Sequence, residues 1–291
     1  MEPIKIGSRE SRLAVVQAES VMACIGAPCT LVTMKTTGDK ILDRTLDQVG
    51  GKGLFVKELD RALADRTVDL TVHSLKDVPM EQPEGLPLVA YSAREDARDV
   101  LVLPAGESVL DPSKPIGCAS ARRRVQLAAL YPGIAVQPVR GNVQTRLRKL
   151  DAGEYGALVL AAAGLKRLGL EGRISRYFSV DEMIPAAGQA ILAVQGRAGE
   201  LPGCVRALDC AESRVCALAE RAFVRALGGS CFAPIAAYAA LDGDTLTLRA
   251  MYAREDESRA VYGMESGPRV QAETIGRTLA VRLRQEAEEE V

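Results

Sequence analysis

The sequence contains little of several residue types that would point to particular functions. Its 291 residues include no tryptophan, four phenylalanines and a single histidine, His73. One histidine is too few for the common zinc sites that combine histidine and cysteine ligands, so we expect no metal centre. The sequence also has no excess of basic residues, because it contains 37 Lys and Arg and 38 Asp and Glu, which gives a formal net charge of −1. Nucleic-acid binders usually carry a clear basic excess, so we expect no nucleic-acid partner.

Long apolar runs are absent too. No uninterrupted apolar segment approaches the roughly 18 residues that a membrane-spanning helix needs. The first residues, MEPIKIGSRE, are charged and lack the apolar core of a secretory signal. Seven cysteines, an odd number, are scattered along the chain. We therefore expect a cytoplasmic protein with reduced thiols and no membrane partner.

What the sequence does contain is enough apolar material for several cores. Hydrophobic residues make up 47% of the chain and charged residues 26%. With roughly 100–150 residues in a typical domain, this length predicts two or three domains. A chain of this size buries enough surface to fold without disulfides or a structural metal.

The first ninety residues alternate between strand and helix patterns. Strands are expected at 3–7, 30–35 and 68–72, and helices at 11–25 and 55–63. This βαβα order predicts a mainly parallel sheet that is covered on both faces.

A charged connector, SAREDARD at 92–99, leads into a second alternating region. The segment Pro185-Ala-Ala-Gly-Gln then indicates a return, with a strand at 190–194 that re-enters the first sheet. Two crossings between two α/β domains predict a cleft with a two-segment hinge. After residue 203 the pattern changes to a helix, three alternating strands and a last helix, which predicts a small α+β domain.

The most unusual segment is Val72-His-Ser-Leu-Lys-Asp-Val-Pro. It lies at the carboxyl end of an expected parallel strand, where open α/β sheets place ligands. Asp77 is suited to act there as a general base or as an anion that stabilises developing positive charge. A turn-capping role beside a solvated Lys76 explains the same residues and stays open. We interpret His73 as a hydrogen-bonded structural residue.

Arginines follow several expected strands or begin expected helices. Arginine binds carboxylate or phosphate through paired hydrogen bonds, so the set favours a polyanionic organic ligand, with scattered surface cations as the alternative. Ser120 is placed to cap the helix that follows it. The set comprises Arg9, Arg122, Arg123, Arg124, Arg140, Arg146 and Arg167, with Lys52 and Lys57 beside a glycine-punctuated segment at 37–52.

The 37–52 segment is polar, and we interpret it as a mobile loop beside a site, although a plain surface loop explains it equally. A second glycine-rich segment, Leu227-Gly-Gly-Ser-Cys231, places a cysteine on a tight loop. Such a thiol is accessible to a reactant, but a small buried hydrophobic residue is the usual role of an unpaired cysteine.

Seven ordered motifs, spread over essentially the whole chain, resemble the porphobilinogen deaminase family, also called hydroxymethylbilane synthase. The motifs are Ser8-Arg-Glu-Ser-Arg-Leu-Ala, Gly50-Gly-Lys-Gly-Leu-Phe-Val-Lys-Glu-Leu, His73-Ser-Leu-Lys-Asp-Val-Pro, Val139-Arg-Gly-Asn-Val-Gln-Thr-Arg-Leu, Ala161-Ala-Ala-Gly-Leu-Lys-Arg-Leu, Pro185-Ala-Ala-Gly-Gln and Gly229-Ser-Cys231.

The resemblance implies an α/β fold of two doubly wound domains that look like periplasmic binding proteins, followed by a small C-terminal α+β domain with a three-stranded antiparallel sheet. The implied boundaries are 1–93 with 190–206 for the first domain, 97–186 for the second and 210–291 for the third. A monomer is the expectation for this family.

The implied activity is that of a transferase in porphyrin biosynthesis. It deaminates four porphobilinogen molecules, condenses them head to tail onto a dipyrromethane cofactor and releases hydroxymethylbilane by hydrolysis. The resemblance assigns the thioether that holds the cofactor to Cys231, and the catalytic carboxylate to Asp77. The residues implied to bind cofactor or substrate are Arg9, Ser11, Gln17, Lys52, Phe55, Ser74, Lys76, Ser120, Arg122, Arg123, Arg140, Arg146, Arg167 and Gln189.

Some positions depart from the family pattern. Cys118-Ala119 replaces a Thr-Ser pair, and Ala190 stands where glycine commonly follows Gly-Gln. A further position, Gln48, is lysine in some members. We expect these changes to affect affinity and not the type of reaction. A solute-binding module explains a cleft with arginines but not the Gly-Gly-Ser-Cys loop or the third domain, and a nucleic-acid binder is a more distant alternative.

Overall fold

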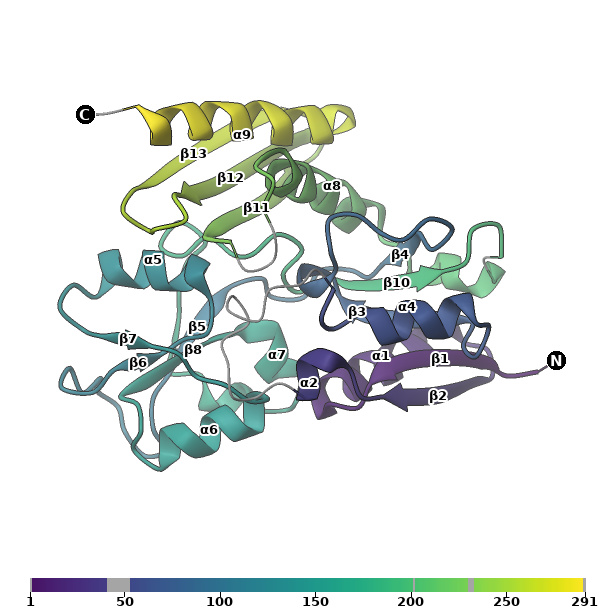
Figure 1. Cartoon of the computed structure of the whole chain (residues 1–291), viewed down its shortest axis with the longest axis horizontal. Coiled ribbons are helices and arrows are strands. Elements are labelled where there is room, and N and C mark those ends of the chain that lie inside the picture. Colours follow the sequence, from purple (N-terminus) through teal and green to yellow (C-terminus); the bar gives the residue numbers. More distant parts are fainter. Residues whose placement is uncertain (1, 41–52, 201, 230–232, 290–291) are drawn as a thin grey trace. The chain divides into compact units, whose positions relative to one another are not determined.

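The structure, a computed structural model, describes residues 2–40, 53–200, 202–229 and 233–289 (Figure 1). The chain divides into two compact units. The first comprises Met1–Glu95 and Gln189–Arg214, and the second comprises Asp96–Gly188 and Val215–Val291.

The first unit is built on a five-stranded sheet with the order β2-β1-β3-β10-β4. Strands β1 (Ile4–Arg9), β2 (Cys29–Met34) and β3 (Leu70–Ser74) are parallel. Strand β10 (Leu192–Gly196) runs antiparallel to both β3 and β4 (Leu88–Tyr91). The predicted return of the chain to the first sheet is confirmed, and the sheet is mixed where a mainly parallel one was expected.

Helices cover both faces of this sheet. Helix α1 (Arg12–Ile25) buries Ala14, Ala18, Val21 and Ile25, which share one face because they are spaced by three or four residues. It packs on the core cluster that contains Leu31 of β2, whereas α4 (Lys57–Ala64) packs on the cluster that contains Val32. Adjacent residues of a strand point to opposite faces, so the two helices lie on opposite sides. The short elements are α2 (Thr37–Lys40), η1 (Leu75–Asp77) and η3 (Gly203–Leu208).

The second unit contains a sheet with the same arrangement, in the order β7-β6-β8-β5-β9. Strands β6 (Ile116–Gly117), β7 (Val136–Gln137) and β8 (Ala157–Ala161) are parallel, and β5 (Asp99–Val102) runs antiparallel to β8 and β9 (Arg176–Tyr177). The helical elements are α5 (Ala121–Leu130), α6 (Val143–Asp151), α7 (Ala162–Arg167) and η2 (Glu171–Arg173).

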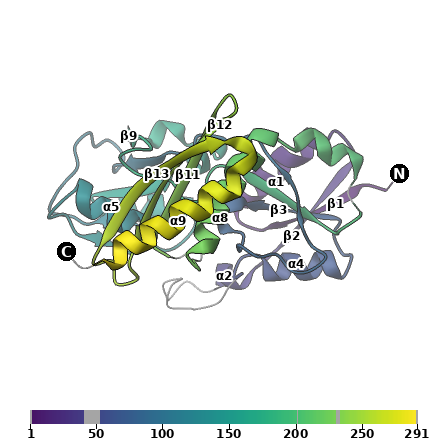
Figure 2. The ribbon, with the colours of Figure 1, turned by 90° about the horizontal axis from the view of Figure 1, so that it is seen from above.

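The same unit holds a three-stranded antiparallel sheet of β11 (Ile235–Asp242), β12 (Thr245–Ala253) and β13 (Ala260–Pro268), as predicted. Helix α9 (Ala272–Glu288) follows η4 (Arg269–Gln271) and lies across this sheet (Figure 2). Gly276 of α9 lies against α8 (Ala211–Ala226), where an added Cβ would come within 2.3 Å of the Ala219 carbonyl oxygen. A larger residue at this crossing would push the helices apart.

Candidate active site

Asp77 lies in the turn that follows β3. The strand ends at Ser74, and the backbone N–H of Leu75 donates to the Ile191 carbonyl at 3.0 Å, which fastens the turn to the neighbouring segment. Asp77 is half-buried, and no residue within the described ranges forms a hydrogen bond or ion pair with its carboxylate. The alternative that Asp77 caps a turn therefore has no supporting contact in the described part of the chain.

Four expected site residues form two pairs beside this turn. The Ser74 hydroxyl lies 3.0 Å from the Gln17 amide nitrogen, which joins the end of β3 to α1. The Lys76 ammonium donates to Gln189 Oε1 at 3.2 Å. Gln17 and Gln189 are both buried, so each presents its amide to a partly exposed residue of the turn.

The His73 imidazole points away from α1 into a buried polar cluster. Its Nε2 lies 2.8 Å from Thr71 Oγ1 and 3.1 Å from Gln195 Oε1, and the Gln195 amide nitrogen donates to the Leu86 carbonyl at 2.9 Å. Burial lowers the pKa of His73 to about 4, so the ring is neutral near pH 7. The expectation of a hydrogen-bonded structural histidine is confirmed.

Arg9 and Phe55 come together at the end of β1. The Arg9 guanidinium carbon lies 4.2 Å above the centre of the Phe55 ring, a cation–π contact. An added Cβ on Gly38 would come within 2.3 Å of the same ring, so a glycine is needed for the ring to lie here.

The Arg9 guanidinium is also paired with Asp39 of α2. Nε of Arg9 donates to Asp39 Oδ2 at 3.2 Å, and Nη2 donates to Oδ1. Burial alone would raise the pKa of Asp39, but hydrogen bonds from Arg9 and Thr36 outweigh burial and hold it below its ordinary value. The arginine expected to bind a ligand carboxylate thus already binds one from the protein.

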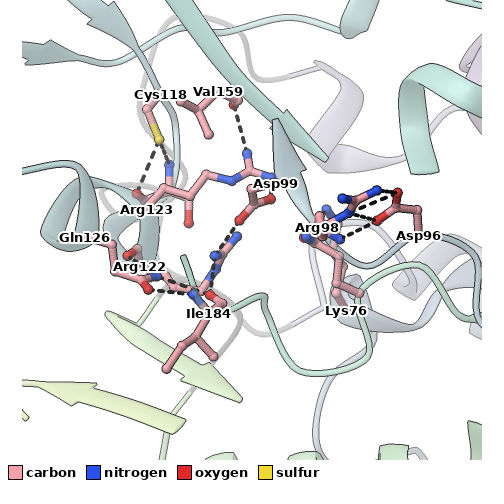
Figure 3. A network of polar contacts seen from close by, with 12 residues as sticks. Lys76, Asp96, Arg98, Asp99, Cys118, Arg122, Arg123, Gln126, Val159 and Ile184 are labelled. Carbon is pink, nitrogen blue, oxygen red and sulfur yellow. Dashed lines mark hydrogen bonds and ion pairs between the residues drawn. The ribbon is translucent and has the colours of Figure 1, made fainter. Parts of the chain in front are cut away.

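Arg122 and Arg123 lie side by side in the first turn of α5 and share one carboxylate, Asp99 (Figure 3). Nη1 of Arg122 and Nη2 of Arg123 each donate to a different oxygen of Asp99 at 2.7 Å. Burial favours a higher pKa for Asp99, but the two guanidiniums outweigh it and keep the carboxylate ionised. Both arginines are buried, so the alternative of scattered surface cations does not hold for this pair.

Two serines of the expected site directly precede helices, and the cap predicted at Ser120 is wrong. Ser11 precedes α1 and its hydroxyl accepts from the Ala14 backbone N–H at 3.3 Å. Ser120 occupies the corresponding position before α5, but its side chain makes no capping hydrogen bond. Both residues are half-buried.

The other predicted arginines of the second unit belong to different elements and do not share the carboxylate of Asp99 in the contacts described below. Arg124 forms an ion pair with Glu257, which lies between β12 and β13. Arg146 Nε donates to the Gly141 carbonyl at 2.8 Å, Arg140 follows buried Val139, and Arg167 ends α7, all three half-buried.

Several predicted features lie outside the described residues. They are Cys231, Lys52, Gln48 and all of the 37–52 segment beyond residue 40. Lys57 begins α4 and is exposed. No group of three or more His, Cys, Asp or Glu within the described ranges is placed to hold a metal ion. No helix among these residues is both long and apolar enough to cross a membrane.

The sequence did not identify Asp39 and Asp99 as the partners of the expected site arginines. Asp39 belongs to the Thr-Thr-Gly-Asp-Lys segment, whose polar composition predicts only a loop. Asp99 closes the charged connector and immediately precedes the apolar residues of β5, and an acid at the start of a fully buried strand is a signal that it has a buried partner.

Comparison with known proteins gives a consistent result over the whole chain. Residues 4–202 match the family model "Porphobilinogen deaminase, dipyromethane cofactor binding domain", and residues 214–285 match "Porphobilinogen deaminase, C-terminal domain". A protein from Ruminiclostridium cellulolyticum named porphobilinogen deaminase is 53% identical over 288 residues, covering 97% of this chain and 98% of its own. One of the same name from Acetivibrio thermocellus is 52% identical over 286 residues, covering 96% and 97%.

Among solved structures, the periplasmic aliphatic sulphonate binding protein SsuA from Escherichia coli is similar with a TM-score of 0.37 and 12% identity, covering 77% of this chain and 70% of its own.

Proposed function

The chain belongs to the porphobilinogen deaminase family, and we propose which of its residues carry out the hydroxymethylbilane synthase reaction. This enzyme is a transferase of porphyrin biosynthesis that condenses four porphobilinogen molecules and has a domain for a dipyrromethane cofactor. Assignment of the individual residues below is our proposal.

We assign the catalytic role to Asp77, and one observation carries this assignment. Its half-buried carboxylate has no hydrogen bond or ion pair among the described residues, whereas Asp39 and Asp99 are each held by arginine. Loss of ammonia from porphobilinogen leaves positive charge that the pyrrole nitrogen shares. An unpaired carboxylate accepts the pyrrole N–H and stabilises that charge, because no cation among the described residues is paired with it.

The cofactor requires a thiol for attachment and cations for the acetate and propionate on each ring. We assign attachment to Cys231, which follows α8 and the Gly228-Gly229 pair. When bound, the dipyrromethane supplies the terminal pyrrole ring to which the next unit is added. The residues present fit such a polycarboxylate, because Nε of buried Arg122 has no hydrogen-bond partner among the described residues. A guanidinium N–H in that state is a donor available to a carboxylate.

Carboxylate binding by some of the other predicted residues is supported by their positions, because Arg9 ends β1, Arg167 ends α7 and Ser11 directly precedes α1. In the first unit, Arg9 is 24% exposed and stacked on Phe55, which leaves part of its guanidinium accessible. Ligand-binding roles are proposed for Arg9, Ser11, Gln17, Lys52, Phe55, Ser74, Lys76, Ser120, Arg122, Arg123, Arg140, Arg146, Arg167 and Gln189.

We further propose a monomeric, cytoplasmic enzyme of three domains, with boundaries at 1–93 plus 190–206, 97–186 and 210–291. The separate apolar clusters of the two five-stranded sheets support the first two domains. Support for the third comes from its own antiparallel sheet.

The test of the catalytic assignment is Asp77→Asn, with Glu81→Gln as a matched control that neutralises an exposed carboxylate four residues further along. We expect Asp77→Asn to keep the melting temperature and the covalent dipyrrole but to lose at least about 100-fold in turnover of porphobilinogen. Glu81→Gln is expected to match the wild type in all three measurements. Turnover within a few-fold of wild type in Asp77→Asn would show that another group stabilises the charge.

A further inference from the structure

Asp99 is the first residue of β5 and is completely buried. Register places it opposite Ala161, the last residue of β8, so its position is set by the sheet itself. Its two carboxylate oxygens face two different guanidiniums, with Oδ2 at 2.7 Å from Arg122 and Oδ1 at 2.7 Å from Arg123. One carboxylate at the start of a buried strand therefore binds both arginines (Figure 3).

Each guanidinium has a second anchor on the backbone. Nη1 of Arg122 also donates to the Ile184 carbonyl at 2.7 Å, and Nη1 of Arg123 donates to the Val159 carbonyl at 3.1 Å. The Ile184 backbone is itself held on both sides by Gln126, whose amide donates to its carbonyl at 3.1 Å and accepts from its N–H at 2.7 Å. A carboxylate and a carbonyl together orient each planar guanidinium and limit its rotation.

The charges explain why a carboxylate is needed here. The side chains of Arg122 and Arg123 are 4% and 8% exposed, so their mutual repulsion is little screened. Burial lowers the pKa of Arg122, the charge of Arg123 lowers it further, and Asp99 opposes both. With two guanidiniums and one carboxylate, the cluster keeps one net positive charge. Without Asp99, the two buried cations would lose the carboxylate that both of them contact.

The third arginine of the run is engaged elsewhere. Arg124 pairs with Glu257 through hydrogen bonds of 2.9 and 3.1 Å from Nε and a further bond from Nη2. This contact joins α5 to the connection between β12 and β13. The run of three arginines therefore separates into a buried pair on Asp99 and one residue that links two parts of the second unit.

We propose that Asp99 is a positioning residue that holds the guanidiniums of Arg122 and Arg123 in the orientation in which they bind the carboxylates of the pyrrole chain. The inference rests on the proposed function in one respect, that this pair binds ligand carboxylates. Asp99 has no direct contact with the ligand in this scheme and acts through the two arginines.

The experiment measures how fast apo-protein, purified from cells that lack porphobilinogen, gains the mass of the covalent dipyrrole when porphobilinogen is added. Asp99→Asn keeps the shape of the side chain but removes its charge and presents an amide N–H to an arginine. We expect assembly to slow by at least about tenfold, because truncating one partner of a buried charge pair weakens binding at that site. Asp99→Glu restores the charge with the carboxylate displaced by one methylene, and we expect an intermediate rate.

Glu220→Gln is the matched control. Glu220 is also a completely buried carboxylate of the second unit, but its oxygens accept the backbone N–H groups of Gly188 and Ala239 at 2.7 Å. Circular dichroism and thermal melting show how far each variant remains folded. We expect Glu220→Gln to lower the melting temperature while its folded fraction assembles at the wild-type rate, which separates positioning from a loss of stability.

Assembly at the wild-type rate in Asp99→Asn, or in Asp99→Glu if the asparagine variant does not fold, would overturn the inference. Arg122→Gln is measured in parallel. If assembly is slow in Arg122→Gln but proceeds at the wild-type rate in Asp99→Asn, only the proposed role of Asp99 is overturned. A wild-type rate in Arg122→Gln would also overturn the proposed binding role of the pair.

Discussion

Acidification from pH 7 to 4 is expected to destabilise the protein through His73. This residue is the only histidine of the chain and is buried against Thr71 and Gln195. Burial is the main reason that its pKa falls from 6.5 to about 4; the charge of Arg9 lowers it further, and the contact with Gln195 opposes both. The neutral ring is therefore the native form.

The sign and size of this loss of stability follow from proton linkage. Below pH 6.5 the imidazole of the unfolded chain binds a proton, whereas the native imidazole does so only near pH 4. The unfolded state thus binds more protons in this window, and the free energy of unfolding falls as the pH falls. The difference between 6.5 and about 4 corresponds to a loss of about 3 kcal/mol. Two of the carboxylates whose pKa values are lowered, Asp39 and Asp99, contribute mainly below this window, because their ordinary pKa is 3.8.

The assay is urea unfolding at several pH values between 7 and 4, for the wild type and for His73→Gln, which retains a polar side chain without an imidazole. We expect the free energy of unfolding to fall by about 3 kcal/mol more in the wild type than in the variant. NMR of the single imidazole measures the native pKa directly. The reasoning would be refuted if the free energy of unfolding changed equally with pH in the two proteins, or if the imidazole titrated near pH 6.5.

Two further changes test local features. Ala190 has a left-handed backbone with φ of 73°, which a residue with a Cβ adopts at a cost, so Ala190→Gly is expected to raise the free energy of unfolding by about 1 kcal/mol in urea titrations. A destabilised variant would show that packing of the Ala190 methyl group stabilises the fold by more than the backbone strain destabilises it. Asp39→Asn removes a carboxylate whose folded pKa is depressed; the stability it provides above its ordinary pKa of 3.8 is lost as the pH falls through the folded value. Below pH 4, the free energy of unfolding should therefore fall less steeply in the variant than in the wild type. The same pH dependence in both proteins would contradict the pairing of Asp39 with Arg9.

The order of elements could be predicted from the sequence, but the direction of individual strands could not. Spacing of apolar residues located β1, β3 and the returning β10, because buried strands and amphipathic helices have distinct periods. Periodicity is the same for parallel and antiparallel strands. The antiparallel course of β5 and β10 therefore appears only in the structure.

In the site, the sequence located the turn of Asp77 but not the partners of the arginines. Asp39 lies 30 residues from Arg9, and Asp99 lies 23 residues from Arg122. Such pairs form only when the sheets bring distant segments together, so no local pattern shows whether a guanidinium faces a ligand or a carboxylate of the protein. For the same reason, the conformational cost of Ala190 became visible only with its backbone angle.

The mass of the intact purified protein tests most directly whether this chain builds its product on a pyrrole primer attached to its own thiol. The account predicts the mass of a covalent dipyrrole on the wild type and on Cys24→Ser, a control at an exposed thiol, and the bare chain mass for Cys231→Ser. A bare wild-type chain after incubation with porphobilinogen, or a dipyrrole retained by Cys231→Ser, would contradict it.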